Sequence, residues 1–173
     1  MSFVVDFITG FTCLDNRLYV VYYLHSTIHV FTADTFSEVT VITVNGLEYP
    51  TYIIASGDDN QLYVSDVFSV WRVSAVKPTN YELWLTVGLP HGFFSLSLTS
   101  RRLLLTYRLS HTLRQYSTVN KELLRVIDLP DPVKRPTYAV ETSRDTFVVS
   151  HLEPHRGVSE LFSKFHYLVV TFT

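Results

Sequence analysis

Short apolar runs, each bounded by polar residues, recur along the chain at a nearly constant spacing. The runs of a first series lie 44, 41 and 44 residues apart and consist of Leu18–Val20, Leu62–Val64, Leu103–Leu105 and Phe147–Val149. The runs of a second series lie 42, 43 and 45 residues apart and consist of Ile28–Phe31, Val70–Val73, Leu113–Tyr116 and Val158–Leu161. A third series consists of Val39–Val44, Glu82–Val87, Leu123–Ile127 and Tyr167–Phe172. Three independent series with one period predict about four structural repeats.

Each repeat holds four strand-like runs separated by Gly, Pro, Asn, Asp or Ser, and no stretch of ten residues follows a helical period. Four short strands in one repeat are typical of a propeller blade, a twisted sheet that packs on the next sheet. The sequence therefore predicts an all-β fold, a β-propeller or propeller arc of about four four-stranded antiparallel blades. We expect a single domain with repeats at approximately 1–48, 49–89, 90–130 and 131–173. The alternative is an unrelated meander or sandwich in which the spacing is coincidental.

The period also predicts which residues are equivalent. Val20, Val64, Leu105 and Val149 occupy the same place in the first series, so we expect them at equivalent buried positions on successive blades. A helix over any of these four residues would contradict the propeller prediction.

The second repeat carries the most distinctive motif. Pro50 opens a strand, a polar turn follows at 58–61, and Leu62–Asp66 leads into a strand that contains Arg72. This pattern, over residues 50–73, resembles the NHL repeat. The resemblance implies an NHL-like propeller, and such propellers usually close with six blades. We therefore expect either that four blades close alone or that the chain is an arc of a longer NHL-like protein.

Charge is distributed unevenly, although the net charge of the 173-residue chain is only −2. Residues 1–100 carry three basic and nine acidic residues, whereas residues 101–156 carry ten basic and six acidic residues. The second part interleaves cations with aromatic rings, and several NHL-type propellers bind single-stranded RNA on a face of this kind. The RNA-binding alternative, or a partner site in the same place, would use Arg101, Arg102, Tyr107, Arg108, Arg114, Tyr116, Lys134 and Arg135. The competing interpretation is a solvated rim of arginines.

The residues that could carry chemistry do not form a known catalytic pattern. Cys13 is the only cysteine, so neither an internal disulfide nor a cysteine-based zinc cage is expected. His25 and His29 are four residues apart, as are His151 and His155, and on a straight strand that spacing is about 13 Å, too far to share zinc. We expect no metal, no cofactor and no enzyme activity.

A metal-dependent hydrolase, similar to propellers that bind calcium, is the third functional alternative. Such propellers hold calcium with acidic residues that point inward from several blades. Asp66 and Glu141 are the only candidates for this role, which are too few for such a site.

The leading functional hypothesis is a non-catalytic protein-interaction module on a propeller scaffold, with a protein partner of unknown identity. The longest apolar stretch, Leu18–Leu24, has seven residues, and the N-terminus lacks a basic signal-peptide region. We therefore expect a soluble, cytoplasmic protein without membrane contact. If the blades do not close, the outer faces of the first and last repeats would be apolar, near Phe3, Val5, Phe165 and Leu168, and the chain would self-associate.

Overall fold

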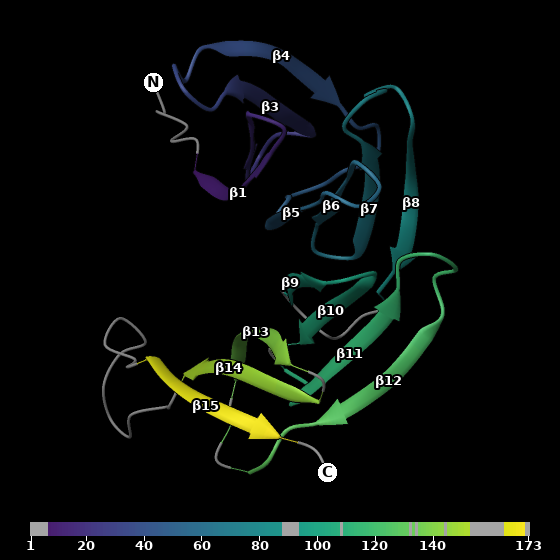
Figure 1. Ribbon diagram of the computed structural model, residues 1–173. Coiled ribbons are helices and arrows are strands. Elements are labelled where there is room, and N and C mark those ends of the chain that lie inside the picture. The colour runs from purple at the N-terminus through teal and green to yellow at the C-terminus, as the bar shows by residue number, and fades with distance from the viewer. Residues whose placement is uncertain are drawn as a thin grey trace. The chain divides into compact units, whose positions relative to one another are not determined.

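The structure is a computed structural model that describes residues 7–87, 94–107, 109–131, 133, 135–143, 145–152 and 165–171. These residues form strands and turns, and none of them lies in a helix. Figure 1 shows the strands grouped into sheets that follow one another along the chain. The all-β prediction is confirmed.

Four antiparallel sheets account for all the described strands. Blade 1 contains β1 (Ile8–Leu14), β2 (Arg17–Tyr22), β3 (Thr27–Thr32) and β4 (Glu38–Thr43), and blade 2 contains β5 (Tyr52–Ser56), β6 (Gln61–Ser65), β7 (Ser69–Ser74) and β8 (Tyr81–Thr86). Blade 3 contains β9 (Phe94–Thr99), β10 (Arg102–Tyr107), β11 (Thr112–Ser117) and β12 (Leu123–Asp128), and blade 4 contains β13 (Pro136–Ser143), β14 (Thr146–Leu152) and β15 (Phe165–Thr171). Each strand pairs with its neighbours in sequence, which is the meander expected for propeller blades.

The predicted equivalence of the second strands is also confirmed. Val20, Val64, Leu105 and Val149 lie on β2, β6, β10 and β14, and all four are buried. Side chains alternate between the two faces of a strand, so the shared register fixes which residues of every blade point the same way.

The last strand of blade 4 differs from the prediction. The spacing of the third series made Tyr167–Phe172 the outermost strand of its repeat, but β15 pairs directly with β14, with Val149 opposite Leu168. Pairing is decided by which apolar residues share a buried face rather than by spacing along the chain. The run Val158–Leu161, predicted for that inner position, lies outside the described residues.

Two compact units divide the chain, residues 1–88 and residues 89–173. In the first unit, one face of blade 1 packs on one face of blade 2. Blade 1 contributes Tyr19, Val21, Ile28, Val30 and Ile42, and blade 2 contributes Ile53, Leu62, Val64 and Val73. We call the face of a blade that contains the position of Tyr19 its trailing face, and the opposite face, which contains the position of Val20, its leading face.

The second unit repeats this contact between blades 3 and 4. Its core joins Leu104, Leu113 and Ile127 from the trailing face of blade 3 to Ala139, Phe147, Val149 and Val170 from the leading face of blade 4. In both units, therefore, a trailing face covers the leading face of the next blade.

The first strands of blades 1 and 2 approach closely enough to exclude a side chain. A Cβ atom on Gly10 would lie 3.0 Å from the backbone nitrogen of Ile53. Beside this contact, the Thr12 hydroxyl accepts a hydrogen bond of 3.1 Å from the backbone N–H of Ala55. The glycine thus allows two backbones to pack directly.

Candidate functional site

An apolar groove lies on the leading face of blade 1, the face that blade 2 does not cover. Its volume is about 400 Å³, and it is lined by Ile8, Phe11, Cys13, Leu18, Val20, Ala33 and Phe36. We call it the blade 1 groove. β1 and β2 build its floor, because Phe11 lies opposite Val20 and Cys13 lies opposite Leu18 in the antiparallel register.

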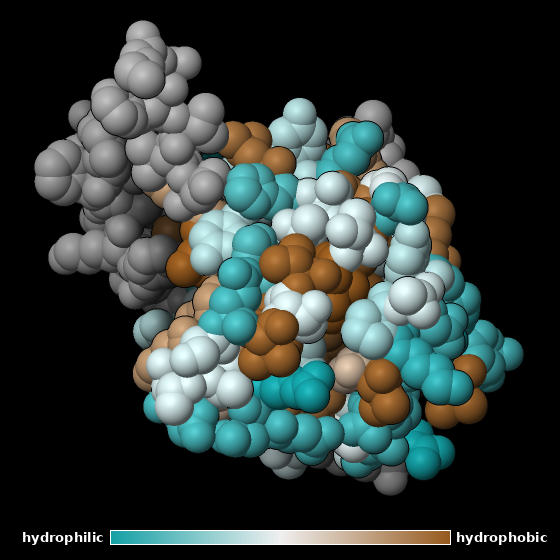
Figure 2. Space-filling model, turned by 90° about the horizontal axis from the view of Figure 1, so that it is seen from above, coloured by the Kyte–Doolittle hydropathy of each residue, from teal (hydrophilic) through white to brown (hydrophobic). Residues whose placement is uncertain are grey.

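Two aromatic side chains of the groove are largely exposed. Phe11 is 68% exposed and Phe36 is 69% exposed. Exposed apolar side chains that line a groove are typical of an interaction site. Figure 2 shows one face of the protein, where apolar residues lie among hydrophilic ones.

The backbone holds Phe36 in an unfavourable conformation. Its φ is 54°, in the left-handed region that bulky residues rarely adopt. The same turn recurs in blade 3, where Lys121 has a φ of 63° and donates its backbone N–H to Ser117, as Phe36 does to Thr32. At this turn position blade 3 has a polar residue, whereas blade 1 has an exposed aromatic ring. The stability of the turn does not explain why blade 1 has phenylalanine there.

Replacing Phe36 with Asn should therefore stabilise the fold. Asn tolerates the left-handed region, so we expect the free energy of unfolding to rise by about 0.5–1 kcal/mol. Chemical denaturation measures this change, and Lys121→Asn in the equivalent turn, where φ is 63°, should raise the free energy of unfolding by a similar amount. A lower free energy of unfolding for the Phe36 variant would mean that the ring contributes to folding rather than to an external contact.

A histidine and a glutamate lie on the same leading face. His29 Nδ1 is 2.7 Å from Glu38 Oε1, and the His29 ring is 5.0 Å from the Tyr22 ring between centroids. The centroids of the His25 and His29 rings are 6.2 Å apart. His25 lies in the turn before β3, so the straight-strand spacing does not apply to this pair. Among the described residues, no three His, Cys, Asp or Glu side chains gather where they could hold a metal ion.

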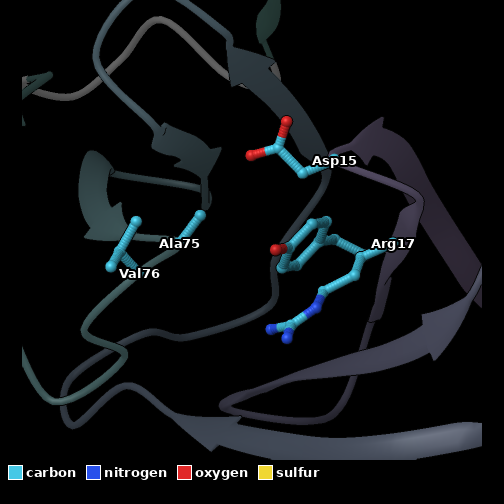
Figure 3. Close-up of a pocket in the computed structure, with 5 residues that line it drawn as sticks. Asp15, Arg17, Ala75 and Val76 are labelled. Atoms are coloured by element: carbon cyan, nitrogen blue, oxygen red, sulfur yellow. The ribbon is translucent and has the colours of Figure 1, made fainter.

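A second, smaller pocket lies between two turns of the first unit. Its volume is about 270 Å³, and its lining comes from the β1–β2 hairpin and from the turn after β7. Figure 3 shows Asp15 and Arg17 on one side, with Ala75 and Val76 facing them from the other. Burial raises the pKa of the Tyr19 hydroxyl, which also lines the pocket, although the nearby Arg17 charge acts in the opposite direction. The pocket combines one charge of each sign with a small apolar wall.

Glu141 lies at the centre of a buried polar network between blades 3 and 4. Its side chain, on β13, is 1% exposed. It accepts a 2.8 Å hydrogen bond from Gln115 Nε2 and lies 3.2 Å from Arg125 and 3.3 Å from Arg102. Arg125 also donates to Gln115 and to Asp145 and packs over the Phe147 ring. The carboxylate that the sequence offered as a candidate calcium ligand instead joins two blades.

Asp66, the other candidate acid, stabilises a hairpin of blade 2. Oδ1 accepts hydrogen bonds of 2.7 and 2.6 Å from the backbone N–H groups of Phe68 and Ser69, and Oδ2 accepts one of 2.8 Å from Trp71 Nε1. Both oxygens of this buried carboxylate are therefore used within the blade.

The structure divides the predicted RNA-binding residues between two faces of blade 3. Tyr107, Arg114 and Tyr116 belong to its leading face, where the Arg114 guanidinium lies 4.9 Å from the centre of the Tyr107 ring. Both tyrosines are buried, and burial raises the pKa of Tyr107. Arg102 faces the other way, toward Glu141.

The remaining residues of that prediction lie elsewhere. Arg101 is in the exposed β9–β10 turn and Arg135 is exposed just before β13. Arg108 and Lys134 lie outside the described residues. RNA binding stays a prediction, and two of its aromatic rings are not presented for stacking on bases.

The sequence pattern did not predict the blade 1 groove. Phe11 and Phe36 belong to no motif and stand apart in sequence. The prediction of apolar outer faces named Phe3 and Val5 in the first repeat, which lie outside the described residues. In the last repeat it named Leu168, but that side chain packs on the core between blades 3 and 4, because it lies opposite Val149 on the leading face.

Four antiparallel meander sheets, packed face to face within each unit, make the chain a protein of β-propeller blades. It is similar to the computationally designed Ika4 protein, with a TM-score of 0.64 at 11% sequence identity over 95% of this chain and 92% of that one. It is also similar to the Kuenenia stuttgartiensis hydrazine synthase, with a TM-score of 0.67 at 15% identity. A third similar structure is the nidogen/laminin complex, with a TM-score of 0.64 at 13% identity.

The last two similarities cover only part of the larger proteins. The aligned region spans 93% of this chain but 45% of the hydrazine synthase chain, and 84% of this chain but 57% of the nidogen/laminin chain. At these identities the likeness concerns the fold alone. No protein-family model and no curated protein matches the sequence.

In the part of the chain that the structure describes, no helix has the length and apolar character needed to cross a membrane.

Proposed function

We propose that this chain is a non-catalytic protein-interaction module on an NHL-like propeller scaffold, and that it binds its partner through the blade 1 groove. The observation that carries the proposal is the leading face of blade 1, with Phe11 and Phe36 exposed beside an apolar hollow. Exposed apolar patches of this kind usually mark an interface, and buried aromatic anchors contribute most of the affinity at such sites.

The non-catalytic part of the proposal has separate support. A general base or a metal ligand needs a carboxylate that can reach a substrate or an ion. The carboxylates of Asp66 and Glu141 already accept several hydrogen bonds inside the protein. Their arrangement favours a role in folding.

Photo-crosslinking tests the proposal directly. We would place a photoreactive amino acid at Phe36 in the full chain, expressed in its own cells, with Val126, an exposed valine on β12, as the control site. The Phe36 probe should give discrete adducts that resist nuclease, and Phe11→Asp in the same chain should reduce them at least tenfold. The control probe should give none of these adducts.

Three results would contradict the proposal. Adducts that are equal at positions 36 and 126 would mean non-specific contact, and no adduct at position 36 would mean that the groove has no partner. Adducts that disappear with nuclease, together with a salt-sensitive mobility shift of single-stranded RNA, would favour the RNA-binding alternative.

A further inference from the structure

We propose that the partner in the blade 1 groove is a second copy of this chain, whose blade 4 covers blade 1 with its trailing face. This inference rests on the proposed function and names its partner. It would reproduce between two molecules the contact that each unit already makes between its own blades.

The two internal contacts place equivalent residues against each other. In the first unit, Val30 and Ala55 belong to one core, and in the second unit Gln115 and Glu141, which hold the same places in the repeat, are 2.8 Å apart. The strand registers establish the equivalence, since Val30 pairs with Tyr19 as Gln115 pairs with Leu104. In both units, therefore, the trailing-face position of Val30 and Gln115 meets the leading-face position of Ala55 and Glu141.

Two faces that make no contact within their own unit carry exposed side chains. On the trailing face of blade 4, Tyr167 is 74% exposed and Val169 is 64% exposed. Val30 and Gln115, which hold the position of Val169 in blades 1 and 3, are 1% and 2% exposed. The other is the leading face of blade 1, where Cys13 is exposed within the groove.

One of these exposed faces is a trailing face and the other is a leading face, as in the contacts within each unit. Their side chains also match in chemistry. Val169 holds the place of Val30 in its repeat, because it pairs with Val148 as Val30 pairs with Tyr19. Cys13 holds the place of Ala55, because it pairs with Leu18 as Ala55 pairs with Leu62. The repeat register would therefore place Val169 of one copy against Cys13 of the next. This combination is apolar on both sides, as Val30 and Ala55 are. No buried charge would be left without a partner, which is the usual obstacle to burying a surface.

The proposed contact is heterologous, since it joins two different faces of the chain. A heterologous contact leaves each copy with one donor and one acceptor face, so association continues until a ring closes or further copies add. Variants that block only one of the two faces can therefore complement each other, which a contact between two identical faces does not allow.

Complementation is the first experiment. We expect the purified chain to associate in a concentration-dependent manner in sedimentation equilibrium, and Phe11→Asp or Tyr167→Asp alone to give monomers. A 1:1 mixture of the two variants keeps one intact groove and one intact blade 4 face, so it should form pairs. Val126→Asp is the matched control and should associate like the unaltered chain. Since all three residues are exposed, circular dichroism should show the folded spectrum for every variant.

Crosslinking maps the register. Val169→Cys creates one partner for the native Cys13, and a short bis-maleimide should join the two. In a 1:1 mixture of ¹⁵N-labelled and unlabelled chains, about half of the joined 13–169 peptides should carry both labels. Val126→Cys should give at least tenfold less product with Cys13, and Cys13→Ser combined with Val169→Cys should give no 13–169 product.

Several outcomes would overturn this inference, and they differ in what they mean for the proposed function. Joined peptides that never mix labels would mean that blade 4 of the same chain occupies the groove, which would contradict the proposed function too. A monomeric mixture of the two Asp variants, together with Phe36 adducts to a different protein, would mean that the partner is not a second copy. The absence of both association and Phe36 adducts would contradict the proposed function as well.

Discussion

Replacing Glu141 with Ala should lower the free energy of unfolding by about 3–5 kcal/mol, the loss typical of a buried ion pair with one partner removed. The carboxylate is almost fully buried, and it accepts hydrogen bonds from Gln115 and Arg125 across the contact between blades 3 and 4. Without it, the Arg125 and Arg102 charges remain near the core with less compensation. Urea denaturation followed by circular dichroism measures the change.

The internal repeat supplies a control for this prediction. Val30, Thr40 and Ala55 are the equivalents in the first unit of Gln115, Arg125 and Glu141. The triple variant Gln115→Val, Arg125→Thr and Glu141→Ala should therefore recover most of the lost stability, because an apolar contact can replace a buried ionic one. A triple variant that is less stable than Glu141→Ala would mean that the network contributes net stability that apolar packing cannot supply.

Most of the fold could be predicted because each blade is a local structure. The runs around Val20, Val64, Leu105 and Val149 are bounded by turn residues, and strands that are neighbours in sequence pair with each other. A single period then fixes which face each residue occupies. The prediction was wrong for the last strand of blade 4, where spacing alone assigned residues 167–172 to the outer position.

The candidate sites could not be predicted in the same way, because they depend on contacts between blades. Glu141 meets Gln115, which is 26 residues away, and no local motif links them. Tyr107 and Arg102 lie five residues apart on β10, but the odd spacing places them on opposite faces. The sequence showed a basic and aromatic segment without showing that its tyrosines are buried. Phe36 is exposed and lies in a turn with a left-handed φ, and composition reveals neither property.

Replacing Asp66 with Ala should lower the free energy of unfolding by about 2–4 kcal/mol, because buried donors that lose a charged acceptor remain unsatisfied. The carboxylate joins the backbone N–H groups of Phe68 and Ser69 to the indole N–H of Trp71. Trp71 in turn packs against Gly46, whose Cβ position would lie 3.0 Å from the ring, so the side chain that Asp66 orients also fixes the segment between blades 1 and 2. We therefore expect the Trp fluorescence spectrum to shift as the indole becomes more mobile.

Two variants separate this role from a general effect of charge. Asp59→Ala removes a carboxylate from an exposed turn of the same blade and should change stability by less than about 0.5 kcal/mol. Asp66→Asn keeps one acceptor oxygen and should fall between the Ala variant and the unaltered chain. If Asp66→Ala denatured at the same urea concentration as Asp59→Ala, the hairpin would not depend on this carboxylate. The Leu62–Asp66 motif would then need an explanation outside folding, such as a contact with a partner.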